Sequence, residues 1–238
     1  MANSIYFNAP CELYKGFLSD NKVEYCLHNV INFVIYAQSS KNGYNKDNCG
    51  EYASEHLCVN CSNPASNYTK GRKLFYELVF PNNTAPAYFS ISKDMYWHFR
   101  NEESTFDERV SALAYLAIKS MIGKREYIKT NMTLLCSRMD GYTRYRGQEL
   151  SPELSKYTNR YWSHKLMNDL YQKYGVIFYC GNAAHKVRGF YCSITLSMAD
   201  LIRKAENARA EARARPDPLR EAQRKALEEI EMQANNSP

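Results

Sequence analysis

Residues 106–196 constrain the fold most, because three helix-like stretches are followed there by two strand-like stretches. In these helix-like stretches apolar side chains recur three or four residues apart, the spacing that places them on one face of a helix. The stretches 176–180 and 190–196 are rich in β-branched and aromatic residues, and Gly181 and Gly189 bound the segment that joins them. This order predicts three packed helices followed by a β-hairpin.

The first of these helices has clear signals at both ends. Ser104 or Thr105 is followed three residues later by an acid, which predicts a capping box, and Gly123 is expected to end the helix. Between them an apolar stripe is formed by Val110, Leu113, Ala114, Ala117, Ile118 and Met121. The stripe predicts a helix with one face in the core.

The second and third helices are predicted from similar signals. After a short strand at 127–129, Thr130 is expected to cap a helix that Gly141 ends. The triplet 151–153 (Ser-Pro-Glu) combines a cap, a first-turn proline and an acid at the positive end of the helix dipole. The third helix is expected to run from there to about residue 174.

These elements predict a fold that is mainly α with a small β wing (α+β). Residues 104–197 are expected to form a winged helix-turn-helix domain. A helical N-terminal region, 1–103, precedes it and contains a polar, Cys/Asn-rich loop at 41–70. A charged, Ala/Glu/Arg-rich helical tail, 198–238, follows, and prolines at 216 and 218 divide it.

Three local signals define the expected helices of the N-terminal region. Pro10 is predicted to be the first residue of a helix that continues over 11–18. Asp20 is expected to cap a second helix, in which apolar residues recur at three and four between 23 and 37. Ser92 is predicted to cap a short helix that extends through residue 99.

The positive charge of the chain is concentrated in its middle part. Residues 119–188 carry thirteen Lys and Arg against five Asp and Glu, which gives this segment a net charge of +8. The net charge of the whole chain is +6. The preceding residues have a net charge of −2 and the following residues a net charge of zero. A basic region that coincides with a predicted helix-turn-helix indicates binding to double-stranded DNA.

The third helix is the expected DNA-reading element, because the third helix of such domains enters the major groove. With Trp162, Leu166 and Leu170 facing inward, the opposite face is expected to carry Thr158, Asn159, Arg160, Ser163, His164 and Met167. Phosphate contacts are expected from Lys129, Arg138, Arg144, Arg146, Lys156 and Lys165, and from Lys186 and Arg188 in the wing. The alternative is a charged helix face that only keeps the domain in solution.

Several motifs within these elements resemble a known group of domains. They read LAIKS, TN, LL, RMDGY, KYTNRYWSHKL, YGV and RGFYCS, and they cover about ninety residues. Together they resemble the winged-helix domain of uncharacterised bacterial proteins of the Bacteroidetes type. They are more loosely similar to the winged helices of plasmid and phage replication initiators. The resemblance implies a winged helix, and a role in transcription or replication control of a mobile element.

Two other functions fit parts of the sequence. A winged helix can act as a protein-interaction module without binding DNA, with an aromatic face around Tyr142, Tyr145 and Tyr157. A zinc site is the second alternative, because thiolates and imidazole are zinc ligands and a Cys-x-x-Cys turn can hold two of them on one ion. Its candidate ligands are Cys49, His56, Cys58 and Cys61.

Neither catalysis nor a cofactor is expected from the motifs present. The sequence has no phosphate-binding glycine loop with Lys-Ser/Thr, no Gly-x-Ser-x-Gly and no His-Glu-x-x-His. It has no apolar run of the ~20 residues that a membrane span needs, and its first residues lack the pattern of a secretory signal. We therefore expect a non-enzymatic cytoplasmic protein whose eight cysteines remain thiols.

Overall fold

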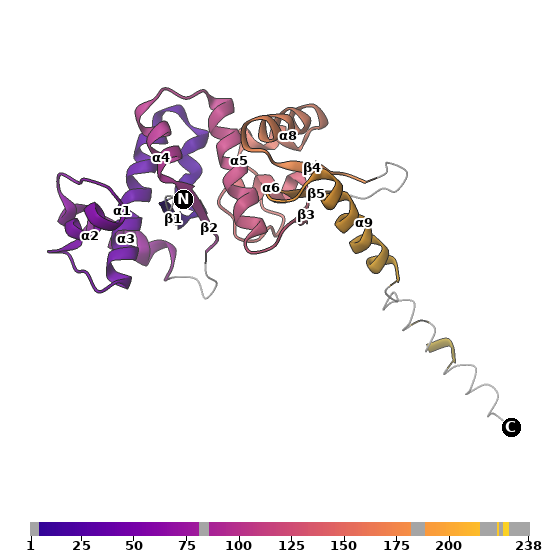
Figure 1. Ribbon diagram of the computed structural model, residues 1–238, viewed down its shortest axis with the longest axis horizontal. Helices are drawn as coiled ribbons and strands as arrows, with labels where there is room; N and C mark the ends of the chain where they lie inside the picture. The colour runs from indigo at the N-terminus through magenta and orange to yellow at the C-terminus, as the bar shows by residue number, and fades with distance from the viewer. Residues whose placement is uncertain (1–4, 81–85, 182–188, 215–222, 224–225, 229–238) are drawn as a thin grey trace.

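The computed structural model describes residues 5–80, 86–181, 189–214, 223 and 226–228. In this part the chain is mostly helical, with two small antiparallel sheets (Figure 1). This agrees with the expected α+β class. Helices α1 to α4 lie at one end of the molecule and α6, α8 and the second sheet at the other, with α5 between them.

Strands β1 (Tyr6–Pro10) and β2 (Tyr88–Ser92) pair antiparallel, with Tyr6 opposite Ser92. Their inward side chains alternate with exposed ones, as expected for strands with one face on the core, and the buried ones include Phe7, Ala9, Phe89 and Ile91. The prediction that Pro10 begins a helix is wrong, because Pro10 is the last residue of β1. Pro10 is held in β1 by the pairing of this strand with β2, in which Pro10 lies opposite Tyr88.

The next residues form two short 3-10 helices, η1 (Cys11–Leu18) and η2 (Asp20–Lys22), before α1 (Val23–Lys41). The apolar periodicity of α1 was predicted correctly: Leu27, Val30 and Val34 are fully buried. The expected cap was wrong. No side chain caps α1, and the Asp20 carboxylate instead forms an ion pair with the guanidinium of Arg109.

The predicted loop at 41–70 is also wrong, because it contains α2 (Cys49–His56) and the start of α3 (Pro64–Leu78). Asn63 caps α3 through its side-chain oxygen, which accepts a hydrogen bond from the backbone N–H of Ser66. Helix α2 is held by packing, since it buries Cys49, Tyr52 and Ala53 and contacts α1 and α3. Packing therefore overrides a composition typical of loops.

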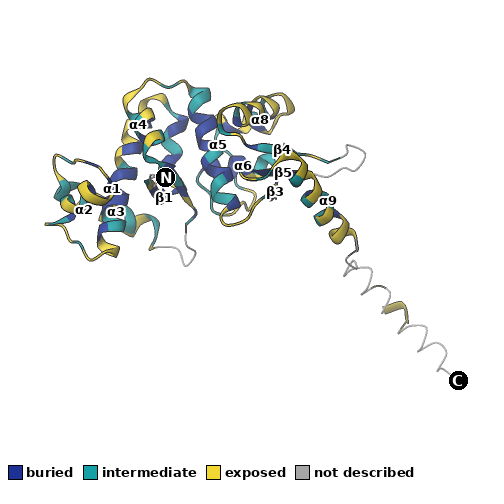
Figure 2. Ribbon diagram, viewed as in Figure 1, coloured by how far each residue is buried: buried dark blue, intermediate teal, exposed yellow. Residues whose placement is uncertain are grey.

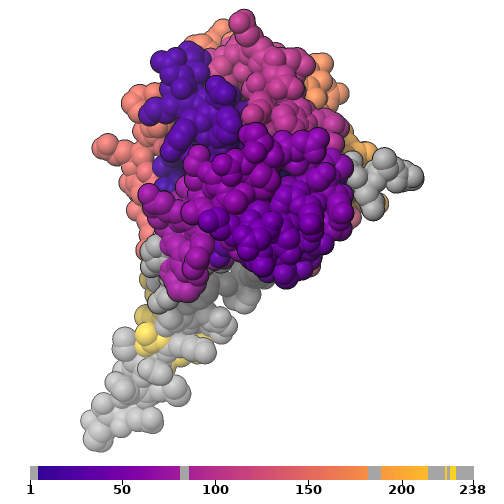
Figure 3. Space-filling model, turned by 90° about the vertical axis from the view of Figure 1, so that its left-hand side faces the viewer, coloured from indigo at the N-terminus to yellow at the C-terminus, as the bar shows by residue number. Residues whose placement is uncertain are grey.

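Helix α3 lies along α1, and Gly71 makes their close approach feasible. A Cβ atom on Gly71 would overlap the backbone carbonyl oxygen of Asn32 in α1. Only glycine fits at this point without separating the two helices. The violet residues of α1, α2 and α3 cover the face of the molecule at this end (Figure 3).

The two predicted caps in the middle of the chain are confirmed. The Ser92 hydroxyl accepts a hydrogen bond from the backbone N–H of Met95 at the start of α4 (Lys93–Asn101). Thr105 and Glu108 form the capping box of α5 (Phe106–Ile122), with Thr105 N donating to Glu108 Oε2 at 2.8 Å. Each of these caps joins residues three positions apart, so both could be predicted from the local sequence.

Helix α5 is buried along most of its length, including nearly all residues from 109 to 118 (Figure 2). It contacts η1 and β2 on the side of the N-terminal elements and α6 and α8 on the other side. The hydrophobic core is therefore continuous from the first strand to the last one. The buried residues of α5 include Arg109, whose Nε donates a hydrogen bond to the carbonyl oxygen of Phe17 at 3.0 Å.

The elements after α5 follow the predicted order with two shifts. Strand β3 (Ile128–Thr130) leads to α6 (Met132–Met139), which is capped by Asn131 and not by Thr130, since Thr130 pairs in the strand. The expected single third helix is interrupted. It begins as α7 (Pro152–Ser155) and a 3-10 turn, η3 (Lys156–Thr158), and an extended residue, Asn159, precedes α8 (Arg160–Tyr174).

The predicted strand pair is present as β4 (Ile177–Tyr179) and β5 (Phe190–Ser193). Strand β5 pairs antiparallel with both β3 and β4, which gives the sheet order β3-β5-β4. Gly175, in the left-handed conformation with φ +66°, ends α8 directly before β4. Residues 182–188, which join the strands and include Lys186 and Arg188, lie outside the described residues.

Helix α9 (Met198–Ala214) is the described start of the tail. It packs on β4 and β5, where Leu201 and Ala205 bury a small second cluster around Tyr191. The expected division of the tail at its two prolines lies outside the described residues. None of the helices in the described ranges combines the length and apolar character that crossing a bilayer requires.

Replacing Gly71 with Ala tests the close contact of α1 and α3. We expect Gly71→Ala to lower the free energy of unfolding by about 1–3 kcal/mol, because the added methyl group must push α3 away from Asn32. The matched control is Thr69→Ala on the exposed face of α3, which should change stability by less than about 0.5 kcal/mol. Chemical denaturation measures both; a Gly71→Ala variant as stable as the parent contradicts this packing.

Candidate nucleic-acid interface

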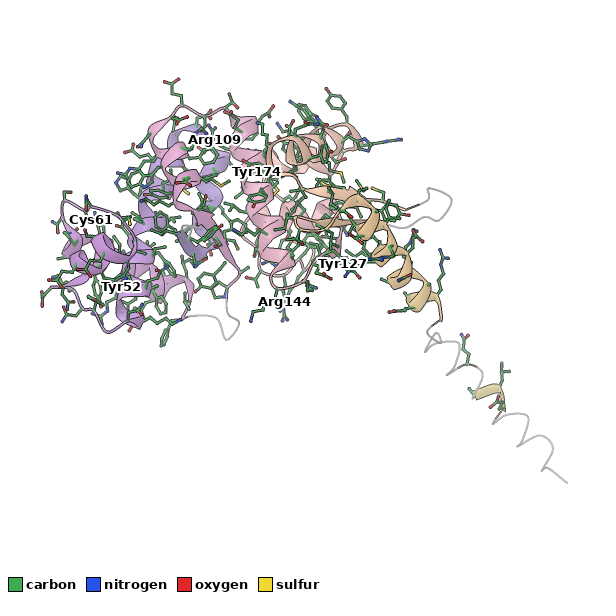
Figure 4. All side chains as sticks on the ribbon, in the orientation of Figure 1. Tyr52, Cys61, Arg109, Tyr127, Arg144 and Tyr174 are labelled. Carbon is green, nitrogen blue, oxygen red and sulfur yellow. The ribbon has the colours of Figure 1, made fainter. Side chains whose placement is uncertain are left out.

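Helix α8 is packed on one side only. Ser163, Leu166 and Leu170 are buried, and the ring of Tyr174 stacks on that of Tyr115 in α5 with a centroid distance of 4.5 Å (Figure 4). The exposed residues of the helix are Arg160, Tyr161, His164, Lys165, Asn168, Tyr171, Gln172 and Lys173. Figure 1 places α8 at the opposite end of the molecule from α1, α2 and α3.

Four of the six residues expected on the DNA-reading face either precede α8 or are covered by the core. Thr158 and Asn159 precede α8, and Asn159 is its cap, accepting a hydrogen bond from the backbone N–H of Tyr161 at 2.9 Å. Ser163 is buried, and Met167 is half-buried against the core. Leu166 and Leu170 are buried and Trp162 packs on the core, so the inward side of the helix is as predicted and the differences lie among the residues expected on its outer face.

The residues that do share an exposed face surround the first turns of α8. Arg160, Tyr161, His164 and Lys165 line a shallow hollow there together with Asn159. Tyr161 is 70% exposed, and it was missed because an aromatic residue next to Trp162 is more often expected in the core. An exposed ring beside cationic groups suits contacts with a sugar or a base.

Lys165 does not present a free charge, because its Nζ donates to Asp107 Oδ2 at 2.6 Å. This hydrogen bond lowers the pKa of Asp107, with a further contribution from the positive charges of neighbouring lysines. The same hydrogen bond raises the pKa of Lys165. The pair links the exposed face of α8 to the first turn of α5.

Lys156, an expected phosphate contact, lies against aromatic rings. Its Nζ is 4.8 Å from the ring centre of Phe106, 5.1 Å from that of Tyr157 and 4.7 Å from that of Trp162. Such cation–π contacts stabilise the ammonium group at the protein surface. The side chain thus helps to fix η3 beside α5, and its charge remains near the start of α8.

The other expected phosphate contacts are spread over the surface. Arg144 and Arg146 are exposed but line a different hollow, together with Cys11, Leu78 and Pro86. Figure 4 shows Arg144 at the opposite edge of the molecule from α8. The half-buried Arg138 donates to the carbonyl oxygen of Thr143 at 2.9 Å, and Lys129 is exposed on β3.

The tyrosines proposed as a flat protein-binding face do not form one. Tyr157 is 3% exposed, and its ring is packed against Trp162. Tyr142 is half-buried below Lys15, whose Nζ is 5.1 Å from the ring centre. Only Tyr145 of the three is exposed.

The candidate zinc ligands are not gathered into a site. Cys49 is buried at the start of α2, where its Sγ donates to the carbonyl oxygen of Lys46, and His56 packs its ring on Tyr52. Cys58 is exposed, and Cys61 lies on the loop before α3. In the described ranges, which include all four of these residues, no group of three or more His, Cys, Asp or Glu is close enough to hold a metal ion.

No protein family model, no curated protein and no solved structure matches this chain. The resemblance to winged-helix proteins therefore stays a prediction.

The Asp107–Lys165 pair gives a test of the geometry at the start of α8. Replacing Lys165 with Met removes the hydrogen bond, so the pKa of Asp107 should rise toward the ordinary range for aspartate. The carboxylate contributes stability above its unfolded-state pKa, and this contribution is lost as the pH falls through the lower folded-state pKa. The Lys165→Met variant should therefore lose less stability on acidification.

Carbon-detected NMR titration of the aspartate carboxyl groups measures this change. The control is Lys173→Met, because Lys173 acts on Asp107 only through a weaker long-range charge. An equal shift in the two variants, or no shift in either one, would contradict the described contact.

Proposed function

We propose that residues 106–193 form a winged helix-turn-helix that binds double-stranded DNA through α8. Support comes from the order α5–β3–α6–α7–α8–β4–β5, with β5 in the centre of a three-stranded sheet. The observation that carries the proposal is the position of α8. It lies on α5 with one face buried, its other face is exposed, and the hairpin β4–β5 follows it directly.

The chemistry of this face suits a nucleic acid. The guanidinium group of Arg160 can donate two hydrogen bonds to a guanine edge in the major groove. The start of α8 carries the positive end of the helix dipole, which favours a phosphate there. Tyr161 and His164 add an aromatic ring and a hydrogen-bonding ring on the same face.

Lys165 has a conditional role in this proposal. In the free protein it is held by Asp107, at a site where both side chains are partly exposed. A DNA phosphate would compete with Asp107 for the ammonium group. Because exposed ion pairs are weak, with a stability contribution below about 1 kcal/mol, the exchange costs little free energy.

Binding without catalysis is the role that we assign, in transcription or replication control of a mobile element. No cofactor or metal enters this role. It requires a surface that docks on a duplex and one or two side chains that read base edges. The exposed half of α8 meets this requirement with Arg160 as the main reading residue.

The first experiment is a selection of duplex oligonucleotides with the whole protein, followed by affinity measurements. We expect affinity for the enriched duplex to fall steeply between about 50 and 200 mM salt, because phosphate contacts release counterions. Arg160→Ala should cost about 1–3 kcal/mol at one base pair and relax the preference there. Lys165→Ala should lower affinity for all sequences and reduce the salt slope by about one.

Arg72→Ala is the matched control, because Arg72 is an exposed arginine on α3, at the other end of the molecule. It should leave both the affinity and the salt slope unchanged. Binding that is indifferent to salt, or an equal loss in Arg72→Ala and Arg160→Ala, would contradict the proposal.

A further inference from the structure

A groove runs along β3 beside α9, apart from the first turns of α8. Helix α9 packs on β4 and β5, so the part of the sheet at β3 extends beyond the helix. The groove, here called the β3–α9 groove, has a volume of roughly 610 Å³. It is lined by residues 124–129, by Tyr191 of β5, and by Ala208 and Ala212 of α9. In Figure 4 Tyr127 lies near α9 and well below α8.

The outer edge of β3 offers unused backbone groups to this groove. In the sheet order β3-β5-β4, β3 lies at an edge and pairs with β5 only. Apart from that pairing, no hydrogen bond within the described ranges uses a backbone N–H or carbonyl group of residues 128–130. An edge strand with unpaired backbone groups can accept an extended peptide as an additional strand.

The charge of the lining is positive. Lys124, Arg125 and Lys129 are exposed, and none of them has an acidic partner in the part of the chain that the structure describes. The acid of the lining, Glu126, is already paired with Lys204 of α9. Arg125 donates to carbonyl oxygens in the last turn of α5, which holds its side chain there. The two lysines therefore remain available for the carboxylates of a ligand.

The floor of the groove is aromatic, and the side formed by α9 has small side chains. The rings of Tyr127 and Tyr191 have a centroid distance of 6.1 Å, and Lys129 Nζ is 5.8 Å from the ring centre of Tyr191. Ala208 and Ala212 leave room beside these rings. A lysine on an edge strand often only opposes aggregation. Here an apolar floor and a second lysine adjoin the same edge, a combination that suits a ligand with both acidic and apolar residues.

We propose that the β3–α9 groove binds an extended acidic segment of a partner protein, which adds to the sheet as a strand beside β3. The backbone of the segment would pair with the edge of β3, and its acidic side chains would pair with Lys124 and Lys129. An apolar side chain between the acids would lie on Tyr127 and against Ala208. A nucleic acid lacks the row of N–H and C=O groups that an edge strand pairs with, so the edge favours a peptide.

This inference is independent of DNA binding through α8. It gives Lys129 a peptide carboxylate as its partner, in place of the phosphate expected from the sequence. Main-chain pairing would supply most of the affinity, and the lysines would supply the preference for acidic sequences.

Selection from a phage-displayed library of random peptides, with the whole protein as the target, tests the site. We expect acidic peptides to be enriched, and a synthetic copy of an enriched peptide should shift the amide NMR signals of residues 126–130. Lys124→Glu and Lys129→Glu should each weaken binding of this peptide about fivefold or more, because an attraction becomes a repulsion. Both lysines are exposed, so the melting temperature should change little.

Lys41→Glu is the matched control, because it makes the same change of charge at the exposed end of α1 and should bind the peptide like the parent. Methylation of the peptide's backbone nitrogens at alternate residues tests strand addition. Methylating the set that faces β3 should abolish binding, and methylating the other set should preserve most of it.

The proposal is overturned if no acidic peptide is enriched, or if both lysine variants bind the enriched peptide as tightly as the parent does. Equal binding of the two methylated peptides also overturns it, since the edge of β3 would then not be used. A Lys129→Glu variant that loses affinity for DNA but keeps its affinity for the peptide would show that the groove holds a nucleic acid instead.

Discussion

The burial of α5 between two sets of elements is the constraint on which the other positions depend. A helix buried on almost all sides needs partners on each flank, and here η1 and β2 cover one flank while α6 and α8 cover the other. Arg109 shows how strict this arrangement is, because a buried guanidinium must have its donors paired. Its partners, Phe17, Asp20 and Ser104, lie outside α5, and two of them belong to the N-terminal residues.

This arrangement also determines which surface of α8 is available. Because α5 takes the apolar side of α8, and the N-terminal elements lie mainly on the other flank of α5, the first turns of α8 stay exposed (Figure 2). The stacking of Tyr174 on Tyr115 and the contact of Lys165 with Asp107 fix both ends of α8 to the same helix. A rigid support of this kind favours recognition, since little conformational entropy is lost when a partner binds.

Local signals in the sequence predicted local structure well. The capping box at Thr105 and the cap at Ser92 depend on neighbours within a few residues, and both are present. The strands around residues 128, 178 and 191 were recognised from their local composition, although β3 pairs with the distant β5. What the sequence did not reveal depends on distant partners. The pairing of β1 with β2, the helices between 49 and 78 and the ion pair of Asp20 with Arg109 all require contacts across long separations. The same limit applies to the site, because the burial of Ser163 and the packing of Met167 on the core depend on contacts with other elements.

We propose that DNA binds at the exposed start of α8. Amide NMR spectra of the labelled whole protein, recorded with and without a duplex enriched by selection, locate the contact directly. We predict that the largest shift changes occur between residues 159 and 168 and that those of α1 and α3 stay small. Shift changes confined to α1 and α3, with the amide signals of α8 unchanged, would contradict DNA binding through α8.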